Sequence, residues 1–328
     1  MSLPKGKNNC ITDIEGVKVG HVTLYEKVDE ETTICTGVTA ILPHSGNLFR
    51  EKNAAGSSVI NGFGKTTGLV QLEELGLLES PIMLTNTFSV GAVTEGTLKY
   101  MLEQTPEIGD TTGTINIVVG ECNDGYLNSI RRQAIRPEHA IQAIEQAEAG
   151  PVEEGAVGAG KGMVCFGHKG GIGTASRTII DKDGEFNLGC LVVSNFGNPE
   201  EARFADLTET NTDTPDGSIM MVLATDAPLS DRQLKRLSKR CAAGLGRTGS
   251  HIAHGSGDIA VAFSTASTYP HQSNSLTETR EFIRDEHPIM NRLFQAVVET
   301  TEEAVIRSLQ QAETTEGRKG RVVKKAPF

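Results

Sequence analysis

The sequence contains no tryptophan, and only 5% of its 328 residues are aromatic. It has no apolar run long enough to span a bilayer, and residues 1–9 lack the apolar core of a secretory signal. Its six cysteines lie far apart without a C-x-x-C pair, which is neither a zinc pattern nor a disulfide framework. The net charge of −11 argues against a surface for nucleic acid or anionic membrane. We therefore expect a cytoplasmic protein with reduced, mostly buried thiols.

Glycine and short apolar segments dominate what is present. The chain has 36 glycines and 38% hydrophobic residues, which indicates many tight turns and packing of small side chains. Apolar strands are expected at 186–196 and 217–228, and helices at 91–104, 232–243 and 289–309. Strands that lead into helices favour an α/β fold, formed either as two domains or as one large unit. A doubly wound dinucleotide fold is disfavoured because its glycine fingerprint is missing.

A turn rich in glycine and hydroxyl side chains, residues 246–258, leads into a probable strand that begins near Ile259. Glycine next to a hydroxyl allows close backbone approach and unusual dihedral angles. The Ser250 hydroxyl could therefore attack the carbonyl of Gly249 and cut the chain. The new amino terminus of Ser250 would have a pKa of about 7.7–8.0, and it could serve as the base for its own side chain. The alternative is a simple glycine-serine turn before a strand.

Three polar residues follow apolar strands and are candidates for substrate contacts. Glu121 could hold a substrate ammonium group, and Tyr126 could supply a hydroxyl donor. The structural alternative is a solvated strand-end carboxylate and a core tyrosine. Asn195 ends the strand expected at 186–196, where a fixed carboxamide N–H suits an oxyanion hole. Asn198 is a less favoured substitute for Asn195.

Two rival sites are weaker. The segment 155–162 imitates a phosphate-binding loop, but Gly162 stands where a Ser or Thr should bind magnesium. A glycine-rich turn between strands is the better interpretation. His251 and His254 beside Ser250 suggest a metal site or a serine–histidine–aspartate triad with Asp258. The metal site lacks a convincing third ligand, and the triad needs no cleavage-prone Gly–Ser bond.

Taken together, these segments resemble the family of self-cleaving N-terminal serine hydrolases that includes L-aminopeptidase/D-esterases and β-peptidyl aminopeptidases. The resemblance runs from about Ile11 to Leu309, and the Gly-Arg-Thr-Gly-Ser segment is its most specific part. The other matching segments are Ile-Thr-Asp at 11–13, Pro-Ile-x-Leu-Thr-Asn-Thr at 81–87, Glu-x-x-Asp-Gly-x-Leu-Asn at 121–128 and Leu-Val-x-x-Asn-x-Gly at 191–197.

The resemblance implies an α/β fold of the N-terminal-nucleophile type, a four-layer αββα sandwich with two mixed sheets. It implies a single catalytic domain, residues 1–328, that cuts itself into an α-chain 1–249 and a β-chain 250–328. These chains would stay packed together and form a homo-oligomer of αβ pairs. The mature enzyme would be an aminopeptidase that needs no metal or organic cofactor. It would release N-terminal β-residues, or L- or D-α-residues, from peptides, amides and esters through an acyl-enzyme on Ser250. An amidohydrolase or acyltransferase of the same fold, acting on a non-peptide amide, is the alternative.

The family also carries a hydroxyl residue and a glutamate that orient the nucleophile, and these fall on Thr300 and Glu302. Residues two apart on one continuous helix point roughly 200° away from each other, so both reach the site only if the helix restarts. Thr300 and Glu303 could form the capping box of such a restart, which is also a purely structural explanation for them. The loop 198–216 is expected to be mobile, and the polar, basic tail 313–328 to be flexible.

Overall fold

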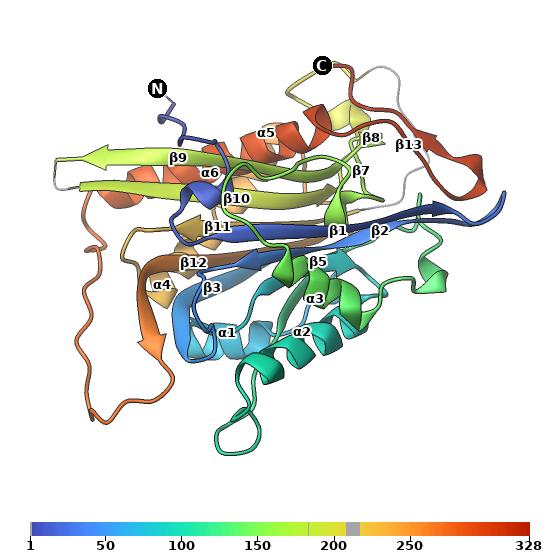
Figure 1. The fold of residues 1–328 in the computed structure, drawn as a ribbon. Helices are drawn as coiled ribbons and strands as arrows, with labels where there is room; N and C mark the ends of the chain where they lie inside the picture. The colour runs from blue at the N-terminus through green and yellow to red at the C-terminus, as the bar shows by residue number, and fades with distance from the viewer. Residues whose placement is uncertain (1, 183, 208–216) are drawn as a thin grey trace.

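The computed structural model describes residues 2–182, 184–207 and 217–328. Two β-sheets lie face to face, and helices cover their outer faces (Figure 1). The smaller sheet has four strands in the order β1-β2-β5-β6, in which β5 and β6 run parallel and the other neighbours antiparallel. Its strands are β1 (Lys18–Lys27), β2 (Thr33–Leu42), β5 (Ile82–Asn86) and β6 (Val118–Cys122).

The larger sheet has six strands in the order β4-β3-β12-β11-β10-β9. Only β11 and β12 run parallel, so this sheet is mixed as well. Its strands are β3 (Glu51–Gly62), β4 (Leu77–Leu78), β9 (Gly171–Asp181), β10 (Gly184–Asn195), β11 (Ser218–Thr225) and β12 (Gly257–Pro270). A short ribbon beside it pairs β7 (Val164–Cys165) with β8 (His168–Lys169).

The two sheets stack through an apolar interface. Every residue of β6 and of β11 is buried, because each strand lies inside its own sheet and against the other sheet. Gly120 of β6 allows the closest approach, since a Cβ there would lie 2.4 Å from Cε of Met220 in β11. One apolar cluster contains residues of both sheets, among them Ile82, Leu84, Leu191, Val222 and Val261.

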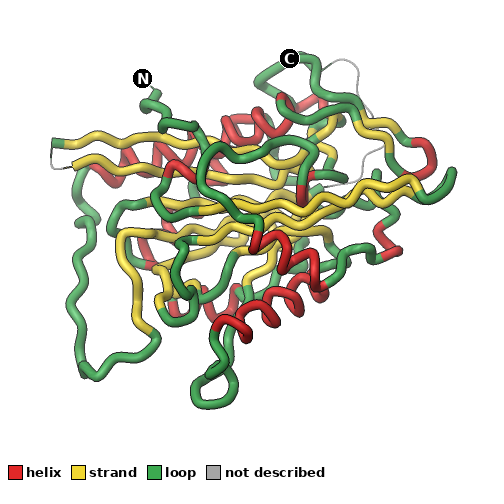
Figure 2. Tube along the Cα trace, in the orientation of Figure 1, coloured by secondary structure: helices red, strands yellow, loops and turns green. Residues whose placement is uncertain are grey.

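Helices form the two outer layers (Figures 1 and 2). Two of them share an apolar core with the outer face of the four-stranded sheet: α2 (Val90–Gln104) and α3 (Pro137–Glu145). Three others pack on the six-stranded sheet: α4 (Asp231–Ser238), α5 (Cys241–Thr248) and α6 (Ile289–Gln310). The remaining helix, α1 (Leu69–Leu75), follows β3. Short 3-10 turns lie at Ile11–Asp13, Ile130–Arg132, Gly158–Gly160, Pro199–Glu201 and Arg318–Gly320. This layer order confirms the expected αββα sandwich.

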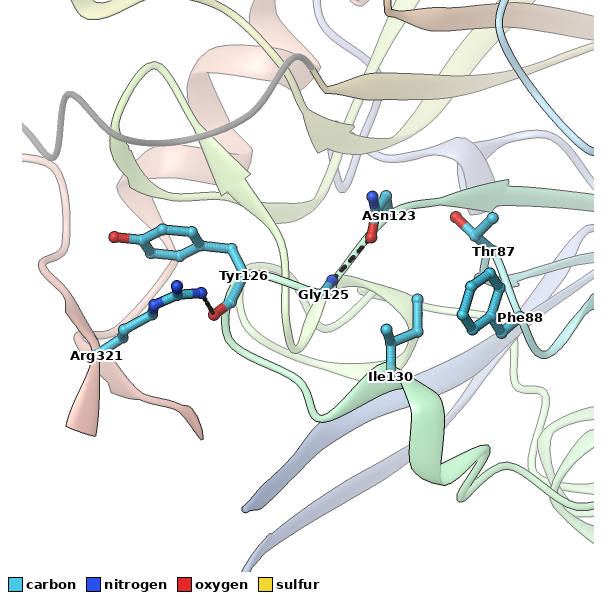
Figure 3. Close-up of a pocket in the computed structure, with 7 residues that line it drawn as sticks. All are labelled: Thr87, Phe88, Asn123, Gly125, Tyr126, Ile130 and Arg321. Carbon is cyan, nitrogen blue, oxygen red and sulfur yellow. Dashed lines mark hydrogen bonds between the residues drawn. The ribbon is translucent and has the colours of Figure 1, made fainter. Parts of the chain in front are cut away.

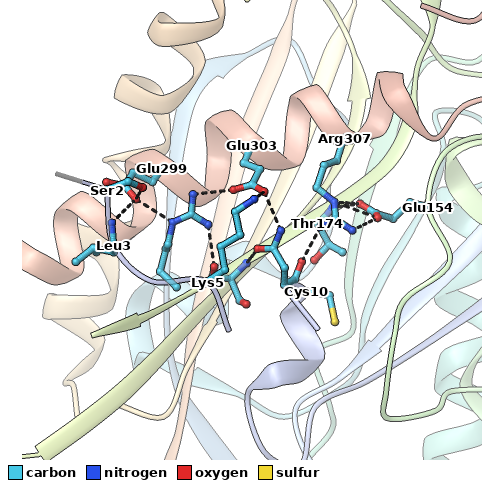
Figure 4. A network of polar contacts seen from close by, with 12 residues as sticks. Ser2, Leu3, Lys5, Cys10, Glu154, Thr174, Glu299, Glu303 and Arg307 are labelled. Atoms are coloured by element: carbon cyan, nitrogen blue, oxygen red, sulfur yellow. Dashed lines mark hydrogen bonds and ion pairs between the residues drawn. The ribbon is translucent and has the colours of Figure 1, made fainter. Parts of the chain in front are cut away.

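The N-terminal segment crosses the outer surface of α6 and is held there by polar contacts (Figure 4). Glu299 accepts hydrogen bonds from the Ser2 hydroxyl at 2.8 Å and from the Leu3 N–H at 3.1 Å. Glu303 accepts from Lys5 Nζ at 2.6 Å. Both carboxylates also bind Arg177 of β9, at 2.8 Å and 2.7 Å, so that one guanidinium bridges two turns of the helix.

The structure corrects three sequence-based expectations about the helices and the tail. The helix expected at 232–243 is two helices, α4 and α5, separated at residues 239–240. The restart expected near Thr300 is wrong, because α6 is one continuous helix. The tail 313–328 was expected to be flexible, but it pairs β13 (Thr315–Glu316) with β14 (Val322–Val323) and buries Val323 and Ala326.

Other expectations concern the cysteines, the loops and membrane helices. All six cysteine side chains are buried, as expected. In the loop 198–216, a 3-10 turn forms at Pro199–Glu201, while residues 208–216 lie outside the described residues, so the expected mobility of the loop stays a prediction. Among the helices that the structure describes, none is both long and apolar enough to cross a membrane.

Candidate active site

Ser250 follows the C-terminus of α5 in a tight turn. Gly249 has a φ of +105°, and a Cβ there would lie 1.8 Å from the Glu201 carbonyl oxygen, so only glycine fits. The Gly249 N–H donates to the Gly246 carbonyl at 3.2 Å. The half-buried Ser250 accepts a hydrogen bond at Oγ from the Ile252 N–H at 3.1 Å. Ile252 has a φ of +62°, which is strained for a β-branched residue. The turn therefore joins glycine geometry and backbone strain next to the hydroxyl.

The segment after β10 packs against this turn. The Arg203 N–H donates to the Thr248 carbonyl at 3.1 Å. His251 Nδ1 lies 2.9 Å from a carboxylate oxygen of Glu201. Asp258 accepts a hydrogen bond from the Ser256 hydroxyl at 2.8 Å, and burial raises its pKa to about 6. The two partners that a Ser250 triad would need are thus engaged with other residues.

Asn195 is the last residue of β10 and pairs with Ser218, the first residue of β11. Its Oδ1 accepts from the Val164 N–H at 2.9 Å, and its Nδ2 donates to the Asn123 carbonyl at 3.0 Å. The Ser218 hydroxyl accepts from the Gly257 N–H at 3.2 Å, at the start of the strand that follows the Ser250 turn. The fixed Asn195 carboxamide thus lies at the same sheet edge as that turn, and its nitrogen carries a second hydrogen.

Glu121 lies near the end of β6 and is only 3% exposed. Its oxygens accept hydrogen bonds from the Lys65 N–H, at 2.9 Å, and from the Thr87 hydroxyl. In the part of the chain that the structure describes, no basic side chain lies within ion-pair distance of it. A buried carboxylate without a counter-ion is costly, and it suits a cationic ligand. Sequence analysis did not single out Thr87, although a hydroxyl directly after an apolar strand was visible there.

The end of β3 connects Glu121 to the Ser250 turn. Asn61 Nδ2 donates to the carbonyls of Ala253, at 3.1 Å, and His254, at 3.0 Å, and also to that of Ser256. Three residues further along, a Cβ on Gly64 would lie 3.7 Å from Glu121 Oε1 and 3.9 Å from the Gly257 Cα. The structure therefore brings the Ser250 turn, Asn195 and Glu121 to one end of the stacked sheets.

A pocket of about 470 Å³ adjoins Glu121 (Figure 3). Its lining residues are Thr87, Phe88, Asn123, Gly125, Tyr126, Ile130 and Arg321. The Tyr126 ring forms part of the wall, and its hydroxyl points away from Thr87 and Phe88 in Figure 3. The Arg321 guanidinium stacks on this ring, 4.5 Å from its centroid, and donates to the Tyr126 carbonyl at 2.9 Å. Sequence analysis missed Arg321, because nothing in a basic tail indicates that it folds back onto a pocket.

Thr300 and Glu302 point to different places, as expected on an unbroken helix. The buried Thr300 hydroxyl donates within α6, to the carbonyls of Ala296 at 2.8 Å and Val297 at 3.2 Å. Glu302 lies 3.2 Å from Arg247, which precedes Ser250 by three residues on α5. Glu303 binds Arg177 and the N-terminal segment instead. Of the two glutamates, Glu302 is therefore the one that contacts the helix leading to Ser250.

The glycine-rich segment 155–162 uses its backbone donors internally. The Gly158 N–H donates to the Thr23 hydroxyl at 2.8 Å, and the Ala159 N–H to Thr39 at 3.1 Å. Lys169 is fully buried, and its ammonium donates to the carbonyls of Gly160, Met163 and Gly170. Burial lowers the pKa of Lys169 to about 7. The segment wraps a lysine of its own chain and fits a structural turn better than a phosphate cradle. In the described residues, no cluster of three or more His, Cys, Asp or Glu could hold a metal ion.

Comparison with known proteins was made against this geometry. The sequence profile described as "Peptidase family S58" matches residues 9–323. The chain belongs to peptidase family S58. It is 40% identical to "Beta-peptidyl aminopeptidase BapA" of Sphingosinicella microcystinivorans, over 98% of this chain and 86% of that protein. The crystal structure of a protein from Pyrococcus horikoshii OT3 superposes with a TM-score of 0.93 and 46% identity, over 100% of this chain and 93% of that one.

A third relative describes the fold directly. The L-aminopeptidase D-Ala-esterase/amidase of Ochrobactrum anthropi, titled a variant of the Ntn hydrolase fold, matches with a TM-score of 0.93 and 34% identity, over 100% of this chain and 93% of that one. The expected family, fold and aminopeptidase class of hydrolase are confirmed. The roles assigned to individual residues, the cleavage at Ser250, the cytoplasmic location and the oligomer stay predictions.

Proposed function

We propose that this S58 chain is the precursor of a serine aminopeptidase and cuts itself between Gly249 and Ser250. The observation that carries the proposal is the turn itself, in which a glycine that nothing else can replace precedes a hydroxyl beside a strained Ile252. The Ser250 hydroxyl attacks the Gly249 carbonyl, and the amide nitrogen leaves as the free amine of Ser250. Water then hydrolyses the resulting ester and leaves a carboxylate on Gly249.

In the mature enzyme, the α-amine of Ser250 takes the proton from its own hydroxyl. Oγ then attacks the carbonyl carbon of the first residue of the substrate. The Asn195 carboxamide and a backbone N–H stabilise the oxyanion, and such a donor contributes about 3 kcal/mol to the transition state. The amine gives its proton to the leaving nitrogen, and water releases the acyl-enzyme by the reverse proton transfers.

Glu121 selects substrates with a free amino group. Its carboxylate has two neutral donors and leaves room for a cation, which the substrate ammonium supplies. Tyr126 forms the neighbouring wall of the pocket. Thr300 stabilises α6, and Glu302 positions α5 through Arg247. Peptides, amides and esters with an unblocked N-terminal residue, including β-residues, are the proposed substrates, in line with the names of the relatives.

The test is mass spectrometry of the purified protein and of the Ser250→Ala variant. We expect the wild type to give two fragments, 1–249 and 250–328, and the variant to remain whole and inactive on aminoacyl amides. Ser256→Ala is a matched control, since it removes another hydroxyl from the same turn and leaves the Gly249–Ser250 bond intact. A wild type that stays uncut and still hydrolyses aminoacyl amides would contradict the proposal.

A further inference from the structure

The pocket beside Glu121 has a cationic group at its other end. Thr87, whose hydroxyl binds Glu121, and Arg321 both line it, and Figure 3 shows them on opposite sides of Gly125. We propose that Arg321 makes this pocket selective for substrates that carry a carboxylate, which it binds while Glu121 holds the ammonium group. The inference rests on the proposed aminopeptidase function and adds a substrate class to it.

The Arg321 guanidinium retains unused binding capacity. One of its N–H groups donates to the Tyr126 carbonyl, and a guanidinium has five such donors. Across the described residues, no carboxylate lies within ion-pair distance of Arg321. Stacking on the Tyr126 ring fixes the plane of the guanidinium and lowers the entropic cost of binding a planar anion. Carboxylate is the group that such a planar fork recognises in bidentate fashion.

The tail that carries Arg321 is anchored to the wall of the pocket. The Arg318 N–H donates to the Leu127 carbonyl at 2.7 Å, and the Gly317 N–H donates to the Arg321 carbonyl at 2.7 Å. Gly317 lies so close to Leu127 that a Cβ there would meet the Leu127 carbonyl oxygen at 2.5 Å. Arg321 is therefore held against the segment 125–127 by the backbone as well as by its side chain. After the proposed cleavage, the α-chain supplies Glu121 and the β-chain supplies Arg321.

The carboxylate could belong to the first residue of the substrate or to the C-terminus of a short peptide. Two pairs of substrates separate these sources: aspartyl against asparaginyl p-nitroanilide, and alanylglycine against alanylglycine amide. In each pair only one carboxylate changes. We expect wild-type kcat/KM to favour the carboxylate member of at least one pair by about tenfold, because ionic hydrogen bonds of this kind are strong but partly exposed here. Raising the salt concentration to 1 M should reduce that preference.

Arg321→Gln should abolish the preference and leave kcat/KM for the neutral member within about twofold, while Arg321→Lys should retain part of it. Lys325→Gln removes a positive charge from the same tail without touching the pocket, and it should change nothing. An unchanged preference in Arg321→Gln, or an equal loss on both members of a pair, would overturn the inference. Failure of the proposed function looks different, because the wild type would then be no faster than Ser250→Ala on any of the four compounds.

Discussion

Glu121 and Glu299 are both buried carboxylates, but their surroundings differ in one respect. Glu299 binds the Arg177 guanidinium and also accepts hydrogen bonds from Gln295, Ser2 and the Leu3 N–H. Burial by itself would raise its pKa, but these partners outweigh burial and lower the pKa to about 2. Glu121 has neutral donors only. The chain supplies the counter-ion of the first carboxylate and leaves that of the second to a ligand.

The difference separates a structural carboxylate from a binding one. The cluster of Arg177, Glu299 and Glu303 joins β9, α6 and the N-terminal segment, and Arg307 extends it by binding Glu154 (Figure 4). Under the proposed cleavage, each of these ion pairs links the α-chain to the β-chain. Glu121, at the other end of the sheets, joins no elements by a charge of its own. Stability should therefore depend on the first cluster and activity on the second carboxylate.

The largest expected effect comes from removing the cation of the structural cluster. Arg177→Met leaves Glu299 and Glu303 buried without their shared partner, which costs about 3–5 kcal/mol of unfolding free energy. Urea unfolding in the uncut Ser250→Ala background measures it. The matched control is Lys99→Met, which breaks the exposed pair with Glu95 and should cost at most about 0.5 kcal/mol. Equal losses in the two variants would remove the distinction between the clusters.

Acid should weaken the same cluster over a defined range. The folded pKa of Glu299, about 2, lies below its ordinary value of 4.5, so its contribution is complete above pH 4.5 and is lost as the pH falls towards 2. The contribution is at most about 3 kcal/mol, from 1.36 kcal/mol per pKa unit. The stability difference between the parent and Glu299→Gln should therefore shrink between pH 4.5 and pH 2. A difference that stays constant over this range would show that Glu299 gains nothing from its charge.

Glu121→Gln tests the binding carboxylate. The amide keeps nearly the same shape and hydrogen-bonding capacity, but it cannot neutralise a substrate ammonium, so kcat/KM should fall by about a hundredfold. The loss should disappear for a substrate analogue that lacks the amino group. Glu299→Gln is the control, because it should lower stability and leave the kcat/KM of the folded enzyme unchanged. A uniform loss on both analogues would mean that Glu121 acts structurally.

Local patterns were sufficient to predict the strands and their polar ends. The strand expected at 186–196 is β10, and the candidates Asn195 and Glu121 do lie at one edge of the stacked sheets. The layer order came from the family resemblance, since strand periodicity alone does not say how sheets stack. The glycine of the Ser250 turn was visible because only glycine adopts its backbone conformation without strain.

Contacts between distant segments could not be predicted in this way. The tail 313–328 has the composition of a disordered segment, yet Val323 and Ala326 fill apolar sites formed by other parts of the chain. The partners of Glu299 come from residues 2–3 and from Arg177, and no local spacing relates them to α6. The break between α4 and α5 was also missed, because it contains neither glycine nor proline. Thr87 and Arg321 became visible as pocket residues only with the fold.

The smallest expected effect lies between the two clusters, at Glu302. Its pair with Arg247 is partly exposed, and such pairs contribute about 0.2–1 kcal/mol. Glu302→Gln should therefore slow self-cleavage by at most about fivefold, through a less firmly held α5, and leave the unfolding free energy almost unchanged. The rate is measured by following the 250–328 fragment after synthesis. Arg247→Gln should give the same slowing, and the double variant should add nothing, because each change breaks the same contact. Additive losses would mean that Glu302 reaches the Ser250 turn by a route that does not include Arg247.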